Sequence, residues 1–204
     1  MTHIDCLKYY NENAELYFQQ THQMSRYYDT VKKHLETFLK FIPPQGKILD
    51  FGCGSGRDSK YFLDHGYQVH LIDGSPAMCR LAHKFTGEPV EQKLFTELDA
   101  NQAYDGIWAS ASILHSDPDD LPEVFARMLR ATKPHGVIYT SFKFGEGVRI
   151  KEGKSYIQII PDRLDEMLSR LPEKARIVQF CTNKSLKRSG SGENLWGNYF
   201  IQKI

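Results

Sequence analysis

The sequence predicts an α/β protein built around a doubly wound, mostly parallel sheet, preceded by a helical arm. Three observations predict it: short apolar runs alternate with amphipathic helical stretches, a glycine-rich segment follows the first run, and an acid ends the second. This alternation favours right-handed βαβ units, which place helices on both faces of a parallel sheet. At 204 residues the chain has the length of one ordinary domain, so we expect one hydrophobic core.

The N-terminal arm is expected to be helical. Residues 5–22 are rich in Tyr, Asn, Glu and Gln, which is typical of a short polar helix. An amphipathic helix should follow, because apolar residues recur with helical spacing at Val31, Leu35, Phe38, Leu39 and Ile42. Pro43-Pro44 should end it, since a proline disfavours the α conformation of the residue before it.

The alternating elements come next. Strands are expected at 47–51, 67–72, 90–95, 104–110 and 136–142, and helices at 59–64, 75–84 and 118–131. Ser75 can cap its helix, and Pro76 suits the first turn. After a helix near 164–171, two strand-like runs at 175–181 and 195–202 are joined by a polar loop at 185–193, so we expect an antiparallel hairpin.

Composition excludes several function classes. The 26 Lys and Arg balance 25 Asp and Glu, which does not resemble the basic footprint of a nucleic-acid binder. No apolar run approaches the roughly 20 residues of a membrane span, and the first residues do not read as a signal peptide. The four cysteines, at positions 6, 53, 79 and 181, are scattered along the chain. This spacing argues against a zinc site or a disulfide framework and favours a reducing cytoplasm. We expect no metal, nucleic-acid or membrane partner.

The glycine-rich segment after the first strand predicts a ligand site. Gly52, Gly54 and Gly56 allow a sharp turn and a close approach of the backbone to a ligand at the carboxyl edge of the sheet. Asp73 ends the second strand, where an acid can accept hydrogen bonds from ribose hydroxyls. A dinucleotide loop would need a small residue where Arg57 stands. The spacing therefore favours a nucleoside that brings a small amino-acid end to the loop.

At these residues the chain resembles the class I S-adenosylmethionine-dependent methyltransferases. The matching segments are ILDFGCGSGRDS (48–59), VHLIDGSPAM (69–78), YDGIWASASILH (104–115) and KPHG (133–136) leading into VIYTSFK (137–143). More narrowly, the chain is similar to bacterial small-molecule methyltransferases of the tellurite-resistance and general methyltransferase-domain groups, through YYNENAELYFQQT and WGNYFIQK.

The resemblance implies one domain over 1–204, with a helical arm or lid at 1–42 and a Rossmann-like core at 43–204. It implies a seven-stranded sheet in the order 3-2-1-4-5-7-6, with strand 7 antiparallel. One turn departs from the family pattern: Pro-Gly-Gly is replaced by Pro134-His135-Gly136. We expect His135 to change the turn type without affecting activity.

The resemblance also implies S-adenosyl-L-methionine as cofactor and S-adenosyl-L-homocysteine as product. Gly52, Gly54 and Gly56 would lie under the methionine part and Asp73 would hold the ribose. Cys53 of the same loop is counted as a contact, although it could instead be a reactive thiol or a small buried filler. The other implied contacts are Tyr9, Tyr17, Thr21, Gly74, Ser75, Met78, Phe95, Thr96, Ala109 and Ser110.

Three side chains near the implied methyl group could act on the substrate. His115 is the candidate general base, since its ordinary pKa suits proton removal near neutral pH. A loop hydrogen bond is its alternative role, and a soft nucleophile needs no base. Lys143 and Arg149 could attract an anionic substrate, or they could belong to a solvated basic loop.

These features predict methyl transfer to a small molecule by in-line displacement, because the arm and an insert at 144–160 leave room for a lid only. The N/D-P-P-Y/F motif of amino-methylating enzymes is replaced by Ser110-Ala111-Ser112-Ile113. Two alternatives stay open: a nicotinamide-dependent oxidoreductase, and a cofactor-binding regulator that has lost catalysis.

Overall fold

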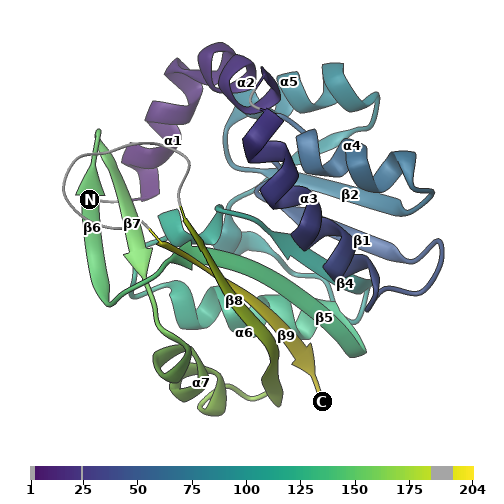
Figure 1. The fold of residues 1–204 in the computed structure, drawn as a ribbon, viewed down its shortest axis with the longest axis vertical. Helices are drawn as coiled ribbons and strands as arrows, with labels where there is room; N and C mark the ends of the chain where they lie inside the picture. Colours follow the sequence, from purple (N-terminus) through teal and green to yellow (C-terminus); the bar gives the residue numbers. More distant parts are fainter. Residues whose placement is uncertain (1–2, 24, 185–194) are drawn as a thin grey trace.

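The computed structural model describes residues 3–23, 25–184 and 195–204. Within them, nine strands form one sheet (Figure 1). The strands are β1 Lys47–Phe51, β2 Gln68–Asp73, β3 Val90–Gln92, β4 Tyr104–Ala109, β5 Thr132–Lys143, β6 Gly147–Lys151, β7 Lys154–Gln158, β8 Ala175–Lys184 and β9 Leu195–Lys203. The helices are α1 His3–Glu12, α2 Ala14–Gln23, α3 Ser25–Leu39, α4 Arg57–Asp64, α5 Pro76–Thr86, α6 Leu121–Ala131 and α7 Pro161–Ser169, with 3-10 turns η1 Phe95–Glu97 and η2 Ile113–His115.

The sheet confirms the predicted α/β fold and its strand order. The parallel part runs β3-β2-β1-β4-β5, and β9 pairs antiparallel with β5 while β8 pairs with β9. With β9 as the seventh strand and β8 as the sixth, this is the order 3-2-1-4-5-7-6. The predicted C-terminal hairpin is therefore confirmed, while its loop at 185–193 lies outside the described residues.

Helices cover both faces of the sheet. On one face, Leu35 and Phe38 of α3 and Phe62 of α4 pack against Ile48 and Trp108 of the sheet. On the other face, α6 and α7 cover a second cluster with β4 and β5 (Figure 1). Fully burying side chains of this size stabilises the fold by about 1.5–3 kcal/mol each. The two buried faces explain why the central strands read as near-continuous apolar runs.

Two further strands, β6 and β7, form a hairpin that was not predicted. Its two-residue loop is Glu152-Gly153, and both residues have positive φ, 52° and 73°. This is the pattern of a type I′ turn, which suits the twist of a two-stranded ribbon. Through Lys143 and Gln158 the hairpin joins the end of β5, so the insert at 144–160 extends the sheet beside the carboxyl edge.

Several boundaries differ from expectation. The third strand ends at Gln92 rather than near residue 95, because the chain turns into η1, where the Leu94 N–H donates to the Glu97 carboxylate at 2.7 Å. The sixth helix begins at Leu121, since 118–120 form a turn before it. His135 takes a φ of 63°, in the left-handed region that favours glycine, so the departure from Pro-Gly-Gly costs backbone strain.

Helix α1 is held against both ends of the carboxyl edge. The Asn11 side-chain carbonyl accepts hydrogen bonds from the Ser75 hydroxyl at 2.6 Å and from the Ala77 N–H at 3.3 Å, which docks α1 on the first turn of α5. At its other end, Cys6 Sγ lies 3.6 Å from Ser155 Oγ of β7. The arm therefore bridges the sheet and the hairpin (Figure 1).

Among the helices of the described ranges, none has the length and apolar character that crossing a membrane requires. The expected cytoplasmic location stays a prediction.

Candidate active site

Two adjoining cavities open at the carboxyl edge of the sheet. The first, here called the cofactor cavity, lies over the glycine loop, and the second, the acceptor cavity, lies between the arm, the β6–β7 hairpin and the C-terminal strands. Six described residues line both cavities and form their junction: Tyr10, Tyr17, Thr21, Ser110, Ala111 and His115. A ligand in one cavity therefore meets a ligand in the other at these residues.

The glycine loop and Asp73 form one hydrogen-bonded unit. One carboxylate oxygen of Asp73 accepts from the Gly54 N–H at 2.8 Å, and the other accepts from the Ser75 N–H at 2.8 Å. Burial raises the pKa of Asp73 to about 6. A carboxylate has about four acceptor sites, so each oxygen keeps capacity for a further donor.

Gly54 leaves room at the loop surface. Its φ is 55°, and a Cβ built there would meet nothing closer than Tyr17 Cε1 at 3.8 Å. Gly56 serves packing instead, because a Cβ there would lie 2.8 Å from Thr86 and 3.2 Å from Ala82 of α5. Of the two glycines, Gly54 thus provides the open cradle for a ligand.

Buried acids lie on the floor of the cofactor cavity. Asp50 accepts a hydrogen bond from the Ser59 hydroxyl at 2.5 Å. Burial, with the nearby charge of Asp58, raises the pKa of Asp50 to about 8. Asp58 accepts from Trp108 Nε1 at 2.9 Å and pairs with the Arg57 guanidinium at 2.7 Å. Because Asp58 pairs with Arg57, a cationic group of a ligand would compensate the charge of the Asp50 carboxylate.

At the junction, the Tyr10 hydroxyl and the His115 ring form a hydrogen-bonded pair, here called the Tyr10–His115 relay. The Nδ1 atom of His115 lies 2.7 Å from the Ser155 carbonyl oxygen, which can only accept, so Nδ1 carries the proton. In the neutral ring, Nε2 then accepts from the Tyr10 hydroxyl, at 2.9 Å. Burial raises the pKa of the Tyr10 phenol well above its usual value, so the phenol stays neutral at physiological pH.

Strained backbone positions this histidine. Ala111 has a φ of 50°, which is unfavourable for a residue with a Cβ. Its N–H donates to the Ser141 hydroxyl at 2.8 Å, and the Ser112 hydroxyl donates to the Phe51 carbonyl at 2.7 Å. These bonds hold the start of η2, so the strained turn sets where His115 enters the junction.

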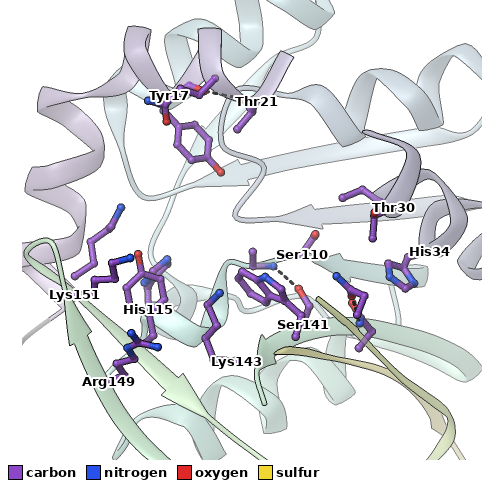
Figure 2. A pocket seen from close by; sticks show the side chains of 18 of the residues that line it. Tyr17, Thr21, Thr30, His34, Ser110, His115, Ser141, Lys143, Arg149 and Lys151 are labelled. Atoms are coloured by element: carbon purple, nitrogen blue, oxygen red, sulfur yellow. Dashed lines mark hydrogen bonds between the residues drawn. The ribbon is translucent and has the colours of Figure 1, made fainter. Parts of the chain in front are cut away.

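The acceptor cavity is rich in cations and aromatic rings. Figure 2 shows Arg149 and Lys151 of the hairpin beside His115, with Lys143 rising from β5 toward the same space. Lys143 Nζ lies 3.7 Å from the centroid of the Trp196 ring, a cation–π contact. Both residues that were predicted to bind substrate, Lys143 and Arg149, line this cavity.

The cofactor residues implied by the resemblance divide into two groups. Those that line the cofactor cavity are Tyr17, Thr21, Gly52, Cys53, Gly54, Asp73, Gly74, Met78, Phe95 and Ser110. Those that do not are Tyr9, Gly56, Ser75, Thr96 and Ala109.

Besides Gly56, which packs against α5, two members of the second group have a clear structural role. Ser75 caps α5 by accepting from the Met78 N–H, and Tyr9 lies under Lys154 with 3.7 Å between the ammonium and the ring centroid. Cys53 is buried and its pKa is raised well above the usual value, so its thiol is neutral. The structure thus favours the filler role of Cys53 over the reactive one.

Sequence reasoning missed Tyr10, Asp50, Lys154, Tyr156 and Trp196. Asp50 stands inside the quoted glycine-loop segment and could have been chosen by its place at the end of β1. The alternation around Glu152-Gly153 could have predicted the hairpin that carries Lys154 and Tyr156. Tyr10 lies next to Tyr9, which was chosen, and only the direction that each ring takes around helix α1 distinguishes the two.

Comparisons with known proteins agree with this geometry. Residues 48–136 match a family described as a methyltransferase domain. YqeM of Bacillus subtilis, a protein named as a methyltransferase, is 29% identical over 133 residues, which cover 58% of this chain and 51% of that protein. The chain spans about half the length of the first curated relatives it matches.

Solved structures show the same fold. The 1,6-didemethyltoxoflavin-N1-methyltransferase of Burkholderia thailandensis, solved with its substrate and S-adenosylhomocysteine, superposes with a TM-score of 0.75 at 20% identity, covering 98% of this chain and 88% of that one. TehB of Haemophilus influenzae gives a TM-score of 0.70 at 16% identity, covering 88% and 65%. The chain therefore has the fold of the class I S-adenosylmethionine-dependent methyltransferases, and its residues 48–136 match a methyltransferase-domain family.

The family match covers the two cavities unequally. Residues 48–136 contain the glycine loop, Asp73 and His115, and they end before Lys143 and the hairpin. The matched segment therefore supplies most of the lining of the cofactor cavity, whereas most of the acceptor cavity comes from segments outside it.

Proposed function

We propose that the protein binds S-adenosyl-L-methionine in the cofactor cavity and transfers its methyl group to a small molecule in the acceptor cavity. The observation that supports this most directly is the junction, where a cradle built on Gly54 and Asp73 opens into a second cavity beside a histidine. In-line transfer requires the two ligands to meet end to end, and correct orientation alone can supply about 7–11 kcal/mol of barrier lowering.

The described residues fit this cofactor. Asp73 would accept from the ribose hydroxyls, since both its oxygens have unused acceptor capacity. The open surface of Gly54 would lie under the methionine part, and the buried acids Asp50 and Asp58 suit its ammonium group. When bound, the cofactor supplies an activated methyl group on a sulfonium. Arg57 and Lys93 are the described cations of this cavity that would suit its carboxylate.

Tyr10 and His115 would remove a proton from the acceptor. The Tyr10 hydroxyl oxygen takes the proton of an acceptor O–H or N–H while its own proton passes to Nε2 of His115. The resulting imidazolium keeps Nδ1–H donated to the Ser155 carbonyl, which stabilises the positive ring. The phenol remains neutral before and after the step, as its raised pKa requires. His115 thus acts through Tyr10 rather than on the acceptor directly.

A small acceptor fits the surroundings of the second cavity. Helix α1 lies across the junction, and the hairpin closes the side beside η2. The structural neighbour from Burkholderia thailandensis holds 1,6-didemethyltoxoflavin, a compound of the size class proposed here. The narrower likeness to tellurite-resistance proteins and the absence of a nucleic-acid partner stay predictions.

Calorimetric titration with S-adenosylhomocysteine and, separately, with NADH tests the cofactor. We expect micromolar binding of the first and none of the second; the reverse would favour the oxidoreductase. Formation of S-adenosylhomocysteine from S-adenosylmethionine, followed over a panel of phenols, thiols, amines and acids, tests catalysis. Tight cofactor binding with no turnover on any acceptor would instead favour the regulator.

A further inference from the structure

The acceptor cavity carries an excess of positive charge. Among its described lining residues are five cations, Lys143, Arg149, Lys151, Lys154 and Lys184, and one carboxylate, Glu152. Glu152 lies 3.6 Å from Lys151 in an exposed pair, and its charge also raises the pKa of Lys154. Figure 2 shows Arg149 and Lys151 of the hairpin and Lys143 of β5 beside one space. The charged groups that line this cavity therefore favour an anionic ligand over a cationic one.

Lys154 is the most constrained of these cations. The residue is only 7% exposed, and its ammonium lies 3.7 Å from the centroid of Tyr9 and 5.6 Å from that of Tyr10. Within the described part of the chain, it has no carboxylate, carbonyl or hydroxyl within hydrogen-bonding distance. Burial lowers its pKa. The ammonium faces the acceptor cavity with little surrounding water, and two aromatic faces replace its lost hydration only in part.

A second buried lysine shows how the same fold satisfies an ammonium where no ligand is needed. Lys203 is 9% exposed, and its ammonium donates to the Leu129 carbonyl at 2.8 Å and to the Thr132 carbonyl at 3.1 Å. Lys154, equally buried, has aromatic rings in place of such acceptors and borders the acceptor cavity. The difference indicates that the hydrogen-bond partner of Lys154 comes from outside the chain.

We infer that the methyl acceptor carries an oxyanion, a carboxylate, sulfonate or phosphate, which Lys154 binds, and an aromatic body that packs among the rings of Tyr156 and Trp196. This inference rests on the proposed function. The anion would lie next to the reacting group, because Ser155, the neighbour of Lys154, holds His115, and the Tyr10 ring lies edge-on to His115 and 5.6 Å from the Lys154 ammonium. Arg149 of the same hairpin and Lys143 of β5 would add positive charge to the same cavity.

A matched pair of fluorescent probes tests this without knowledge of the acceptor. 8-Anilinonaphthalene-1-sulfonate and N-phenyl-1-naphthylamine share one ring system, and only the first carries a sulfonate. Both are titrated into the protein saturated with S-adenosylhomocysteine, so that the cofactor cavity is filled. We expect the sulfonate to bind at least about tenfold more tightly, the contribution of one charge-assisted hydrogen bond.

Variants assign the effect to Lys154. Lys154→Met should weaken the sulfonate about tenfold and leave the neutral probe unchanged, while Lys154→Arg should retain most of the affinity. Lys174→Met, which removes an exposed lysine outside both cavities, should behave as the wild type. Equal binding of the two probes, or a Lys154→Met protein with undiminished sulfonate affinity, would overturn the inference. Failure of S-adenosylhomocysteine to bind in calorimetry would instead overturn the proposed function.

Discussion

The two cavities differ in charge although they share a wall. The cofactor cavity is lined by the acids Asp50, Asp58 and Asp73 of β1, α4 and β2, together with the cations Arg57 and Lys93. The charged residues that line the acceptor cavity are five cations from β5, the hairpin and β8 and one carboxylate, Glu152. The net charge of the whole chain is only +1, so composition does not reveal this difference. The comparison teaches that folding can gather cations in one cavity while it mixes acids and bases in the neighbouring one.

Substitutions of Tyr10 and His115, which line both cavities, should give the largest loss of activity. Tyr10→Phe removes the hydroxyl and keeps the ring, and His115→Asn removes the base; each should lower kcat by about 100-fold or more on an acceptor that must lose a proton. The double variant should be little worse than either single variant, because the two groups act in one chain.

Calorimetry on the same relay variants supplies the control. S-adenosylhomocysteine affinity should stay close to that of the wild type, since neither change removes a cofactor hydrogen bond proposed above. Full turnover by either variant across the pH range would show that no base is used.

Removing the ribose acceptor should affect the cofactor cavity alone. Asp73→Ala loses two proposed hydrogen bonds to ribose and the hydrogen bond that holds the Gly54 N–H. The affinity for S-adenosylhomocysteine should therefore fall by about 100-fold, or ~3 kcal/mol. The exposed Asp165→Ala on α7 serves as a matched control. Unchanged affinity in the Asp73 variant, measured by calorimetry, would contradict the ribose assignment.

The acids should also make cofactor binding depend on pH. Once ionised, Asp73, with a pKa of about 6, accepts hydrogen bonds from ribose hydroxyls more strongly, and Asp50, with a pKa of about 8, attracts the ammonium group, so affinity should rise about tenfold from near pH 5 to near pH 8.5. Asp50→Asn should remove the upper part of that rise.

The raised pKa of Asp50 should also lower the folding stability of the cofactor-free protein as pH rises, although it increases cofactor affinity over the same range. Because the folded pKa of Asp50 exceeds its unfolded value of 3.8, the free protein loses stability as pH rises between the two values. Asp50→Asn should therefore be more stable than the wild type by roughly 1–3 kcal/mol at pH 8 and similar near pH 4. Equal melting temperatures at pH 8 would show that the burial of Asp50 carries no such cost.

The smallest effect is expected away from both cavities. His135→Gly relieves a φ of 63° in an exposed turn and should stabilise the fold by about 0.5–1 kcal/mol. Thermal melting measures it, and neither S-adenosylhomocysteine nor the sulfonate probe should change in affinity. A destabilised variant would mean that the histidine side chain makes a compensating contact.

Sequence reasoning reached the cofactor half of the site better than the acceptor half, for a physical reason. The glycine loop and Asp73 act through local backbone geometry at strand ends, which spacing along the chain records. Ser155 and Tyr10 contact His115 across 40 and 105 positions of sequence, and only tertiary packing brings them together. Strand order was predictable because alternation restricts the topology, whereas the hairpin was overlooked although its turn residues were readable.

The docking of α1 has a kinetic consequence. One helix of ten residues donates Tyr10 to the wall between the cavities and anchors on α5 through Asn11. Since Tyr10 lines both cavities, a movement of this helix would change access to both of them at once. If that movement limits turnover, the turnover rate should fall as solvent viscosity increases.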